Sequence, residues 1–218
     1  MSKRIIETNV GIQGAAGVDI FDQFARGMRD KNMLHYDVYL HAGIKHGQVL
    51  EIGPGPGYVG LEWLKQAPGA RLTGLEISPD MIALAERNRD SYGFSQRVSY
   101  VQGDSQAMTF PDNQFDGVFS NGSMHEWEHP EKIFNESYRV LKPGGVICIT
   151  DLRRNINPLI KLLIAHTIKP KEIRPGFVNS VNAAYTVDEV RYFLQKTNFG
   201  AADVKQDFMG LTIIGKKV

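Results

Sequence analysis

Cysteine is almost absent from this chain. Cys148 is the single cysteine among the 218 residues, and it lies in the apolar run GVICIT. One thiol cannot form a disulfide within the chain, and it is too few for a cysteine-rich metal site. We therefore predict no metal site and a reducing, cytoplasmic location.

Long apolar runs and an excess of one charge are also missing. No run approaches the roughly 18 apolar residues of a membrane-spanning helix. The stretch 1–14 has basic residues but lacks the apolar core of a signal peptide. The net charge of +1 provides no overall field that would attract nucleic acid. We expect no nucleic-acid partner and no integral membrane association.

Strand patterns and helix patterns alternate through the middle of the chain. Strands are predicted over 48–52, 71–77, 97–103, 115–120 and 145–151, with helices over 58–66, 79–92 and 130–140. Such alternation is typical of βαβ units and predicts an α/β fold with a mostly parallel sheet and helices on both faces. The runs AADVKQDF and LTIIGKKV, separated by Met209-Gly210, predict a closing antiparallel hairpin at the sheet edge. The total is seven strands, including an antiparallel C-terminal strand.

The chain contains no linker or internal repeat, so we predict a single domain over 1–218. Residues 1–46 are expected to form an N-terminal helical cap, in which Phe21, Phe24 and Met28 make one stripe at helical spacing. Residues 152–185 interrupt the alternation after the fifth strand and are expected to form a lid-like insertion.

The most distinctive stretch is VLEIGPGPGYVG, from Val49 to Gly60. Its glycines fit both G-x-G-x-G, with residues 53, 55 and 57, and G-x-G-x-x-G, with residues 55, 57 and 60. The loop follows the first predicted strand, at the edge where open α/β sheets bind ligands. Glycine allows a sharp turn and a close backbone approach to a ligand. The loop alone fits NAD, an adenosyl ligand or simply a tight turn.

Two acidic residues follow the next two predicted strands. Glu76 ends the second strand, where a carboxylate can accept both hydroxyls of a ribose. Asp104 follows the third, where it could accept from an adenine amine while the amide of Ser105 donates to the ring. Each acid alone could also be a solvent-facing residue or a helix N-cap, but acids at successive strand ends along one crevice favour a nucleoside-containing ligand. The loop with Glu76 still fits NAD as well as any adenosyl ligand.

In combination these motifs resemble those of the class I S-adenosylmethionine-dependent methyltransferases. The resemblance covers the segment from Val49 to Asp151, about half the chain. It includes FDGVFSNGSMHEWEHPEKIFNESYRVLKPGGVICITD, which is similar to the family's fourth-strand region and its Leu-Lys-Pro-Gly-Gly turn. The family pattern E-x-G-x-G-x-G and its two strand-end acids are met by Glu51, Gly53, Gly55, Gly57, Glu76 and Asp104.

The resemblance implies a Rossmann-like fold, S-adenosyl-L-methionine as the cofactor, and a contact for each part of it. The three glycines would pack against the methionine part, Glu51 would help to hold its ammonium, and Glu76 would take the ribose. The remaining implied contacts are Ile77 and Met81 against adenine, Asp104 and Ser105 at its edge, and Asn121 and Gly122 at the methionine end.

The acceptor is expected to meet the methyl group near SNGSMHEW. Many similar enzymes that act on small molecules carry His-His at the positions of His125 and Glu126, so this chain departs from the pattern. Each of these two residues is a candidate general base, and each also has a purely structural interpretation. Trp127, Tyr36, Tyr185, Arg153 and His166 are candidate substrate contacts, with Phe177 as a further wall residue.

The segment 152–175 holds six basic residues and one acid, interleaved with leucine and isoleucine. It could be a lid over a pocket for an apolar or anionic molecule, a surface that packs within the chain or in a homodimer, or a contact with a membrane surface.

We predict a methyltransferase that acts on a small-molecule acceptor. The alternatives are a non-catalytic cofactor-binding protein and an NAD-dependent oxidoreductase. The oxidoreductase would use a Tyr-x-x-x-Lys pair such as Tyr138 and Lys142.

Overall fold

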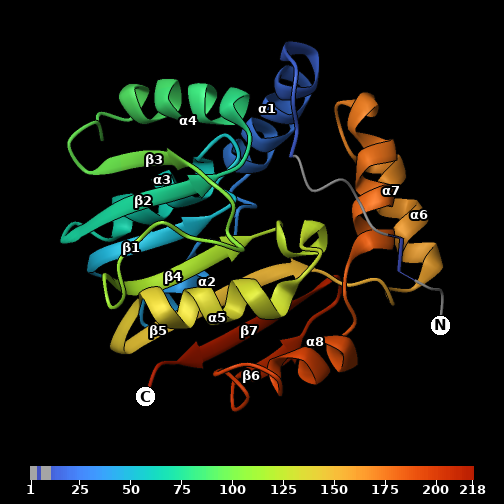
Figure 1. Cartoon of the computed structure of the whole chain (residues 1–218). Helices are drawn as coiled ribbons and strands as arrows, with labels where there is room; N and C mark the ends of the chain where they lie inside the picture. The colour runs from blue at the N-terminus through green and yellow to red at the C-terminus, as the bar shows by residue number, and fades with distance from the viewer. Residues whose placement is uncertain (1–3, 6–10) are drawn as a thin grey trace.

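A seven-stranded sheet forms the centre of the computed structural model, which describes residues 4–5 and 11–218 (Figure 1). The strand order is β3-β2-β1-β4-β5-β7-β6, and β1 to β5 pair in parallel. The strands are β1 (Gly47–Ile52), β2 (Ala70–Glu76), β3 (Val98–Gln102), β4 (Phe115–Asn121), β5 (Leu141–Leu152), β6 (Asp203–Gln206) and β7 (Gly210–Lys216). The predicted fold class is confirmed.

The closing hairpin is antiparallel, as the sequence predicts, but its two strands are not equivalent. Strand β7 pairs antiparallel with both β5 and β6, so it lies inside the sheet and β6 forms the edge. The burial of the two strands explains the order. Ile213 in β7 is fully buried, whereas three of the four residues of β6 are exposed.

Apolar side chains on both faces of the strands explain why helices cover both faces. Val49 and Leu50 are neighbours in β1, both fully buried, and they pack into different core clusters. The cluster around Leu50 includes helices α5 (Pro130–Val140) and α8 (Val187–Leu194). The cluster around Val49 includes α2 (Asp37–His41) and α3 (Tyr58–Gln66), while α4 (Pro79–Ser91) packs beside β2 and β3. Because successive side chains of a strand point to opposite faces of the sheet, a strand that is apolar throughout needs a layer of helices on each face.

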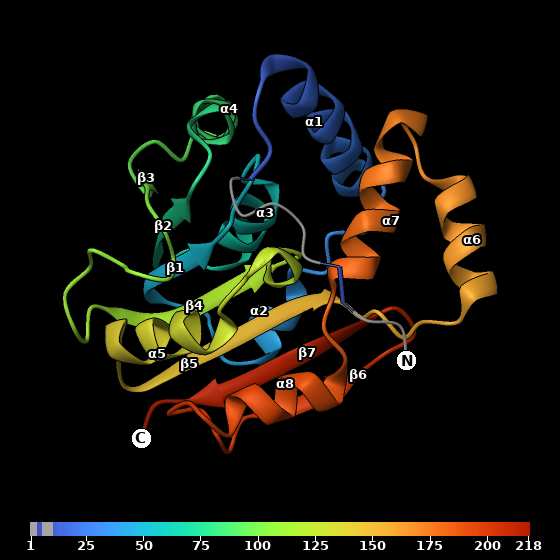
Figure 2. The ribbon, with the colours of Figure 1, turned by 45° about the vertical axis from the view of Figure 1, so that its right-hand side comes forward.

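Two groups of helices stand beyond the carboxyl ends of the parallel strands (Figure 2). The first is α1 (Ala15–Asp30) from the N-terminal region. The second comprises α6 (Pro158–Thr167), the short 3₁₀ helix η2 (Lys171–Ile173) and α7 (Arg174–Ala183). Helix α7 packs against the 3₁₀ helix η1 (Met124–Glu126), η2 approaches α1, and α6 packs on α7 as the outermost element. In the described part of the chain, no helix has both the length and the apolar character needed to cross a membrane.

Candidate active site

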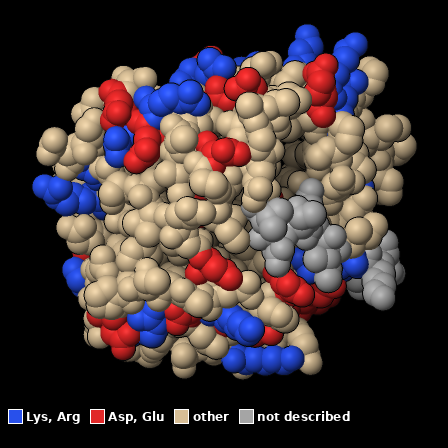
Figure 3. Space-filling view, turned by 45° about the horizontal axis from the view of Figure 1, so that its top comes forward, with Lys and Arg blue, Asp and Glu red and all other residues tan. Residues whose placement is uncertain are grey.

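A cavity of about 340 Å³ lies where β1 to β4 end, and the molecular surface is hollowed on this side (Figure 3). That volume is typical of a site for a small molecule or cofactor. One wall comes from the strand ends and the loops that follow them. The opposite wall comes from α1, the loop 33–35 and the segment around η1.

The glycine loop turns the chain from β1 into α3 through backbone conformations that favour glycine. Gly53 has a φ of 65°, and a Cβ there would lie 2.7 Å from Cβ of Ser123. Gly57 has a φ of 83° at the N-cap of α3, and a Cβ there would overlap the hydroxyl of Tyr100. Gly53 lines the cavity with Gly55, whereas Gly57 does not. Gly57 is therefore required by the turn and its packing, and the cofactor contact predicted for it is not seen in the cavity lining.

Glu51, the last residue but one of β1, is 1 % exposed and lines the cavity. Its Oε2 has no hydrogen-bond partner within the described residues. Burial raises the pKa of this carboxyl to about 8; the nearby amide of Gly60 opposes the rise and the charge of Glu76 adds to it. A Cβ at Gly60 would collide with the Glu51 carboxylate, so the fourth glycine of the motif makes room for the acid beneath α3.

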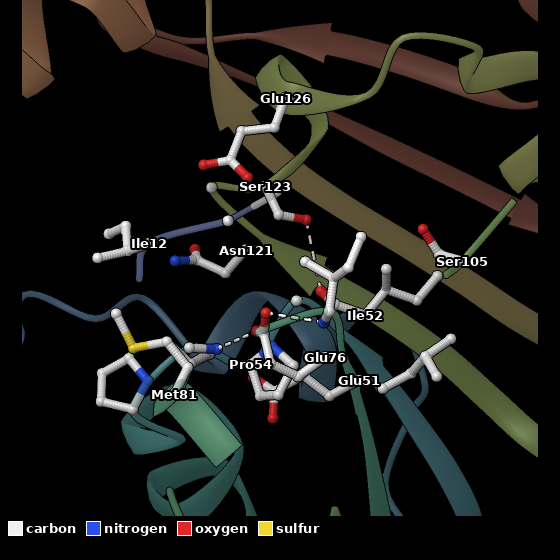
Figure 4. A pocket seen from close by; sticks show the side chains of 18 of the residues that line it. Ile12, Glu51, Ile52, Pro54, Glu76, Met81, Ser105, Asn121, Ser123 and Glu126 are labelled. Carbon is white, nitrogen blue, oxygen red and sulfur yellow. Dashed lines mark hydrogen bonds between the residues drawn. The ribbon is translucent and has the colours of Figure 1, made fainter. Parts of the chain in front are cut away.

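Glu76, the last residue of β2, is held by backbone amides (Figure 4). Its Oε1 accepts from the amides of Ile77 at 2.9 Å and Ser78 at 3.0 Å, and its Oε2 accepts from Gly55 at 3.0 Å. Burial raises the pKa of Glu76, and these three hydrogen bonds oppose the rise. The carboxylate therefore ties the glycine loop to the end of β2, and one of its four lone pairs, on Oε2, remains for a ligand.

The side chains expected near an adenine ring lie at the ends of β2 and β3. Ile77, Met81, Asp104 and Ser105 all line the cavity. Met81 is 2 % exposed in the first turn of α4, which Ser78 caps by accepting from the Met81 amide. Asp104 Oδ1 accepts from the amide of Gln106 at 2.8 Å, which fixes the turn after β3.

The end of β4 supplies Asn121, Gly122 and Ser123 to the cavity. Thr150 in β5 donates to Oδ1 of Asn121 at 3.0 Å, and the amide of Gly122 donates to the carbonyl of Thr150 at 2.8 Å. The Asn121 side chain extends into the pocket between the glycine loop and η1 (Figure 4). These bonds hold the loop after β4 against the neighbouring strand, so its backbone groups have a fixed place at the cavity.

The N-terminal region covers the cavity from the other side. Ser78 Oγ donates to the carbonyl of Ile12 at 2.6 Å, and the amide of Gly14 donates to Asp80 at 2.8 Å. These bonds hold the segment 11–14 across the start of α4, so Gly11 and Ile12 close one end of the cavity. From there α1 continues the wall with the apolar residues Phe21, Phe24, Ala25 and Met28, followed by Met33 and Leu34.

The segment after β4 carries the residues that face α1. Glu126 and Trp127 line the cavity, and Trp127 packs edge-on against Phe134 of α5 with ring centroids 5.9 Å apart. Tyr185 donates its hydroxyl to the carbonyl of Trp127 at 2.6 Å, and Arg4 donates to that same carbonyl at 3.2 Å. The wall that presents Glu126 and Trp127 is therefore fixed from behind.

His125 is turned away from the cavity. Its Nδ1 lies 2.9 Å from Asp151 Oδ1, its backbone amide donates to Asp151 Oδ2 at 2.6 Å, and the residue is 6 % exposed. It does not line the cavity. The His125–Asp151 pair joins η1 to the end of β5, which is a positioning role.

Four of the five predicted substrate contacts also lie outside the cavity lining. Tyr36 precedes α2 and packs with the core on the α3 face of the sheet, and Tyr185 lies behind Trp127. The guanidinium of Arg153 donates to the carbonyl of Asp207 at 3.2 Å, and His166 is exposed on α6. Phe177 in α7 is likewise absent from the lining, as is every residue of the insertion 152–185.

The cavity lining also contains residues that the sequence did not predict as site residues, among them Gly11, Ile12, Phe21, Phe24, Ala25, Met28, Met33, Leu34, His35, Gln106, Ser123 and Glu128. The stripe of Phe21, Phe24 and Met28 was a visible signal. Its helical spacing predicted a helix, but a stripe of this kind does not reveal what the helix packs against.

The donors and acceptors around the cavity fit S-adenosylmethionine. A buried carboxylate with an unpartnered oxygen, Glu51, suits an ammonium group. Glu76 retains one lone pair, on Oε2, that a ribose diol could share, and Asp104 can accept from an amine at the end of β3. No group of three or more His, Cys, Asp or Glu side chains within the described residues is arranged to hold a metal ion. The strand order and this donor set are those of the class I S-adenosylmethionine-dependent methyltransferase fold.

Comparison with known proteins agrees with this class. Residues 50–149 match the model of a family described as a methyltransferase domain. A sterol 24-C-methyltransferase of Gibberella zeae is 37 % identical over 130 residues, which cover 58 % of this chain and 34 % of that protein. A ubiquinone/menaquinone biosynthesis C-methyltransferase of Cereibacter sphaeroides is 29 % identical over 114 residues, which cover 52 % of this chain and 46 % of that protein.

Among solved structures, a Methanococcus maripaludis protein provisionally described as an S-adenosyl-L-methionine-dependent methyltransferase superposes with a TM-score of 0.74. It shares 23 % identity, and the match covers 100 % of this chain and 97 % of that one, so it shows the fold. Both curated relatives are longer proteins, of which this chain spans between a third and a half. Residues 50–149 thus match a methyltransferase domain, and the chain as a whole has the fold of the class I S-adenosylmethionine-dependent methyltransferases.

Proposed function

We propose that this protein transfers a methyl group from S-adenosylmethionine to a small, apolar acceptor. The observation that carries the proposal is the composition of one cavity. Three carboxylates, those of Glu51, Glu76 and Asp104, come from the ends of successive strands, and the opposite wall is built of apolar side chains. One cavity thus offers a polar wall suited to the cofactor and an apolar wall suited to the acceptor.

The residues at the strand ends would hold the cofactor. Glu51 would pair with its ammonium, Glu76 would accept from its ribose hydroxyls, and Asp104 with Ser105 would contact the adenine edge. Ile77 and Met81 would pack against the ring. When bound, S-adenosylmethionine supplies an electrophilic methyl group on a sulfonium centre. The protein's contribution is then to hold the acceptor atom in line with that group and to exclude water.

The lining of the cavity favours an apolar acceptor over an anionic one. Within the described residues, no lysine or arginine lines the cavity, whereas Phe24, Met28 and Trp127 do. The charged or titratable residues of the lining are His35, Glu51, Glu76, Asp104, Glu126 and Glu128, together with Tyr58. An anionic acceptor would meet carboxylates without a compensating lysine or arginine. The names of the relatives, a sterol and a quinone methyltransferase, point to acceptors of the same apolar class.

Glu126 is the residue we propose as general base, if the acceptor must lose a proton. It lies on the acceptor wall beside Trp127, and its carboxylate points into the pocket (Figure 4). His125 would act indirectly, because its link to Asp151 positions the 3₁₀ helix that carries Glu126. Glu126→Gln should lower kcat and leave cofactor affinity unchanged, whereas His125→Ala should disturb both the wall and the stability.

The residue pair that suggested an oxidoreductase lies outside the cavity. Tyr138 donates its hydroxyl to the carbonyl of Val218 at 3.2 Å, and Lys142 donates to Asp116 at 2.7 Å. Neither residue lines the cavity. A Tyr-x-x-x-Lys pair can donate a proton to a substrate only from within the site, so this match is structural.

The proposal is tested by calorimetric titration with S-adenosylmethionine, S-adenosylhomocysteine and NAD, followed by turnover with quinol and sterol acceptors. We expect both adenosyl ligands to bind and NAD not to bind. Asp104→Ala should weaken the binding, whereas the exposed Asp203→Ala should not. Binding of NAD alone would overturn the proposal. Tight cofactor binding without turnover of any acceptor would support the non-catalytic alternative.

A further inference from the structure

The outermost helix of the molecule, α6, presents an apolar face to the outside. Leu159, Leu162 and Leu163 are 75 %, 69 % and 65 % exposed. With His166, which is also exposed, they stand at positions i, i+3, i+4 and i+7, so they form one continuous stripe along the helix. A surface helix of a soluble domain normally turns its charged residues outward, and α6 does the reverse.

The opposite face of α6 is already used for attachment to α7. Ile160 and Ile164 are partly buried, and Lys161 Nζ donates to Asn182 Oδ1 of α7 at 2.5 Å. Both ribbon views show α6 outside α7, with no labelled element on its far side (Figures 1 and 2). The leucine stripe is therefore a second apolar face, separate from the one that holds the helix in place.

The charges next to the stripe are mainly positive. Helix α6 contains no acid, Lys169 and Lys171 are exposed just beyond its end, and Glu172 is the only acid between residues 152 and 175. Arg174 donates to the carbonyl of Ile168 at 3.1 Å and to that of His166, which fixes this basic turn at the C-terminal end of the helix. Exposed leucines next to lysines are complementary to a partner that has an apolar interior and anionic groups at its boundary.

We propose that α6 docks in the surface of an anionic lipid bilayer, with its leucine stripe among the acyl chains and Lys169 and Lys171 at the headgroups. A helix of this kind lies in the plane of the interface with its apolar face buried by roughly 5–10 Å. A second copy of the chain fits less well: a parallel two-fold contact would bring the same basic turns together, and an antiparallel one would set each basic turn against an α6 that contains no acid. The docking does not rest on methyl transfer.

The position of α6 would bring the cavity near the bilayer. Helix α6 packs on α7, and α7 packs on η1, which carries Glu126 of the cavity wall. A docked α6 therefore places the acceptor side of the cavity two elements away from the lipid surface. A molecule that partitions into the bilayer would have a short path to the site.

The first test is flotation of the full chain, without cofactor, with two kinds of vesicle. One is phosphatidylcholine alone, and in the other about a third of the lipid is phosphatidylglycerol. We expect the protein to float with the anionic vesicles and to be released by high salt. Equal absence from both kinds of vesicle would overturn the proposal.

Two variants test the two halves of the surface independently. Leu159→Gln with Leu162→Gln and Leu163→Gln should weaken binding to anionic vesicles by about tenfold or more. Lys169→Glu with Lys171→Glu should weaken it as well, and should abolish its salt dependence. The matched controls are Tyr192→Gln, which changes a side chain 63 % exposed on α8, and Lys45→Glu with Lys205→Glu, which makes the same change in charge elsewhere. Neither control should alter binding.

A third variant reports insertion directly. Both native tryptophans, Trp63 and Trp127, are buried, so Leu162→Trp adds an exposed fluorophore. Its emission should shift to the blue on anionic vesicles, and nitroxides on the acyl chains should quench it. If light scattering instead shows a dimer that the leucine variants dissociate, and lipid nitroxides do not quench the introduced indole, the stripe is a subunit interface and the proposal is overturned. Cofactor titration of each variant separates these outcomes from failure of the proposed function.

Discussion

The two walls of the cavity are built in different ways. On the sheet wall, Glu51 and Glu76 stand at the ends of paired strands, and Glu76 is held by three backbone amides. On the helical wall, Phe21, Phe24 and Met28 are partly exposed side chains of one helix that lies across the strand ends. The sheet wall is fixed by hydrogen bonds between paired strands and to Glu76, whereas α1 in the helical wall is held by apolar packing and by side-chain hydrogen bonds such as the one from Tyr58 to Asp22. Substitutions should therefore separate cofactor binding from acceptor binding.

The largest effect is expected on the sheet wall. Glu76→Ala would remove the charge-assisted hydrogen bonding that we propose between this residue and the ribose, worth about 1.5–3 kcal/mol, so the dissociation constant for S-adenosylmethionine should rise roughly 10- to 100-fold. The change also releases the amides of Gly55, Ile77 and Ser78. Calorimetric titration measures the affinity. Glu86→Ala, at a side chain 48 % exposed on α4, is the control. A change of less than about threefold in Glu76→Ala would mean that this acid does not hold the cofactor.

The second prediction tests how strictly the backbone fixes the sheet wall. Gly53→Ala places a Cβ 2.7 Å from Ser123 at a φ of 65°, which should cost about 1–3 kcal/mol of the free energy of unfolding. Gly27, in the middle of α1, has open space where a Cβ would lie, and Gly27→Ala should stabilise the protein by about 0.5–1 kcal/mol. Urea unfolding measures both. Equal effects at the two sites would show that the glycine loop can relax.

The same contrast explains how much could be predicted from the sequence. The acids that the pattern singled out, Glu51, Glu76 and Asp104, all line the cavity, because parallel strands bring their carboxyl ends to one edge. Because the strands can be recognised from local sequence, the residues at their ends can be predicted as well. The role of each motif residue cannot be predicted in this way, since Gly57 serves the turn and does not line the cavity.

The acceptor side could not be predicted in this way, because it depends on which surfaces pack together. Met33 and His35 reach the cavity only because the segment 11–14 and α1 lie across the strand ends. His166 and Leu163 share a face of α6, as their spacing indicates, but that face points outward. Helical periodicity identifies a stripe and leaves its partner undetermined.

The third prediction addresses the helical wall. Phe24→Ala removes apolar surface from the wall that we propose faces the acceptor, so kcat/KM for an apolar acceptor should fall roughly tenfold. The dissociation constant of S-adenosylmethionine should change by less than about twofold, because the strand ends are untouched. Steady-state kinetics with varied acceptor, together with cofactor titration, separates the two effects. Tyr192→Ala, at an exposed aromatic of α8, is the control. Loss of cofactor affinity in Phe24→Ala would show that the two walls are not independent.

The fourth prediction concerns the protonation of Glu51. Its pKa is about 8 in the folded protein and 4.5 when unperturbed, so the folded state keeps a proton that the unfolded state loses between these values. The contribution of Glu51 to the free energy of unfolding therefore falls as the pH rises from about 4.5 to 8, and is constant above that window. Glu51→Gln should remove this part of the pH dependence. Urea unfolding at several pH values measures it.

Cofactor binding should also change the protonation of Glu51. An ammonium beside Glu51 favours the carboxylate and lowers its pKa, so binding near pH 7 should release a proton from this residue. Calorimetry in buffers with different ionisation enthalpies measures that proton, and Glu51→Gln should release correspondingly less. If the wild type and Glu51→Gln release the same number of protons, Glu51 does not face the ammonium, and the cofactor's methionine end must be held by Asn121 and the glycine loop instead.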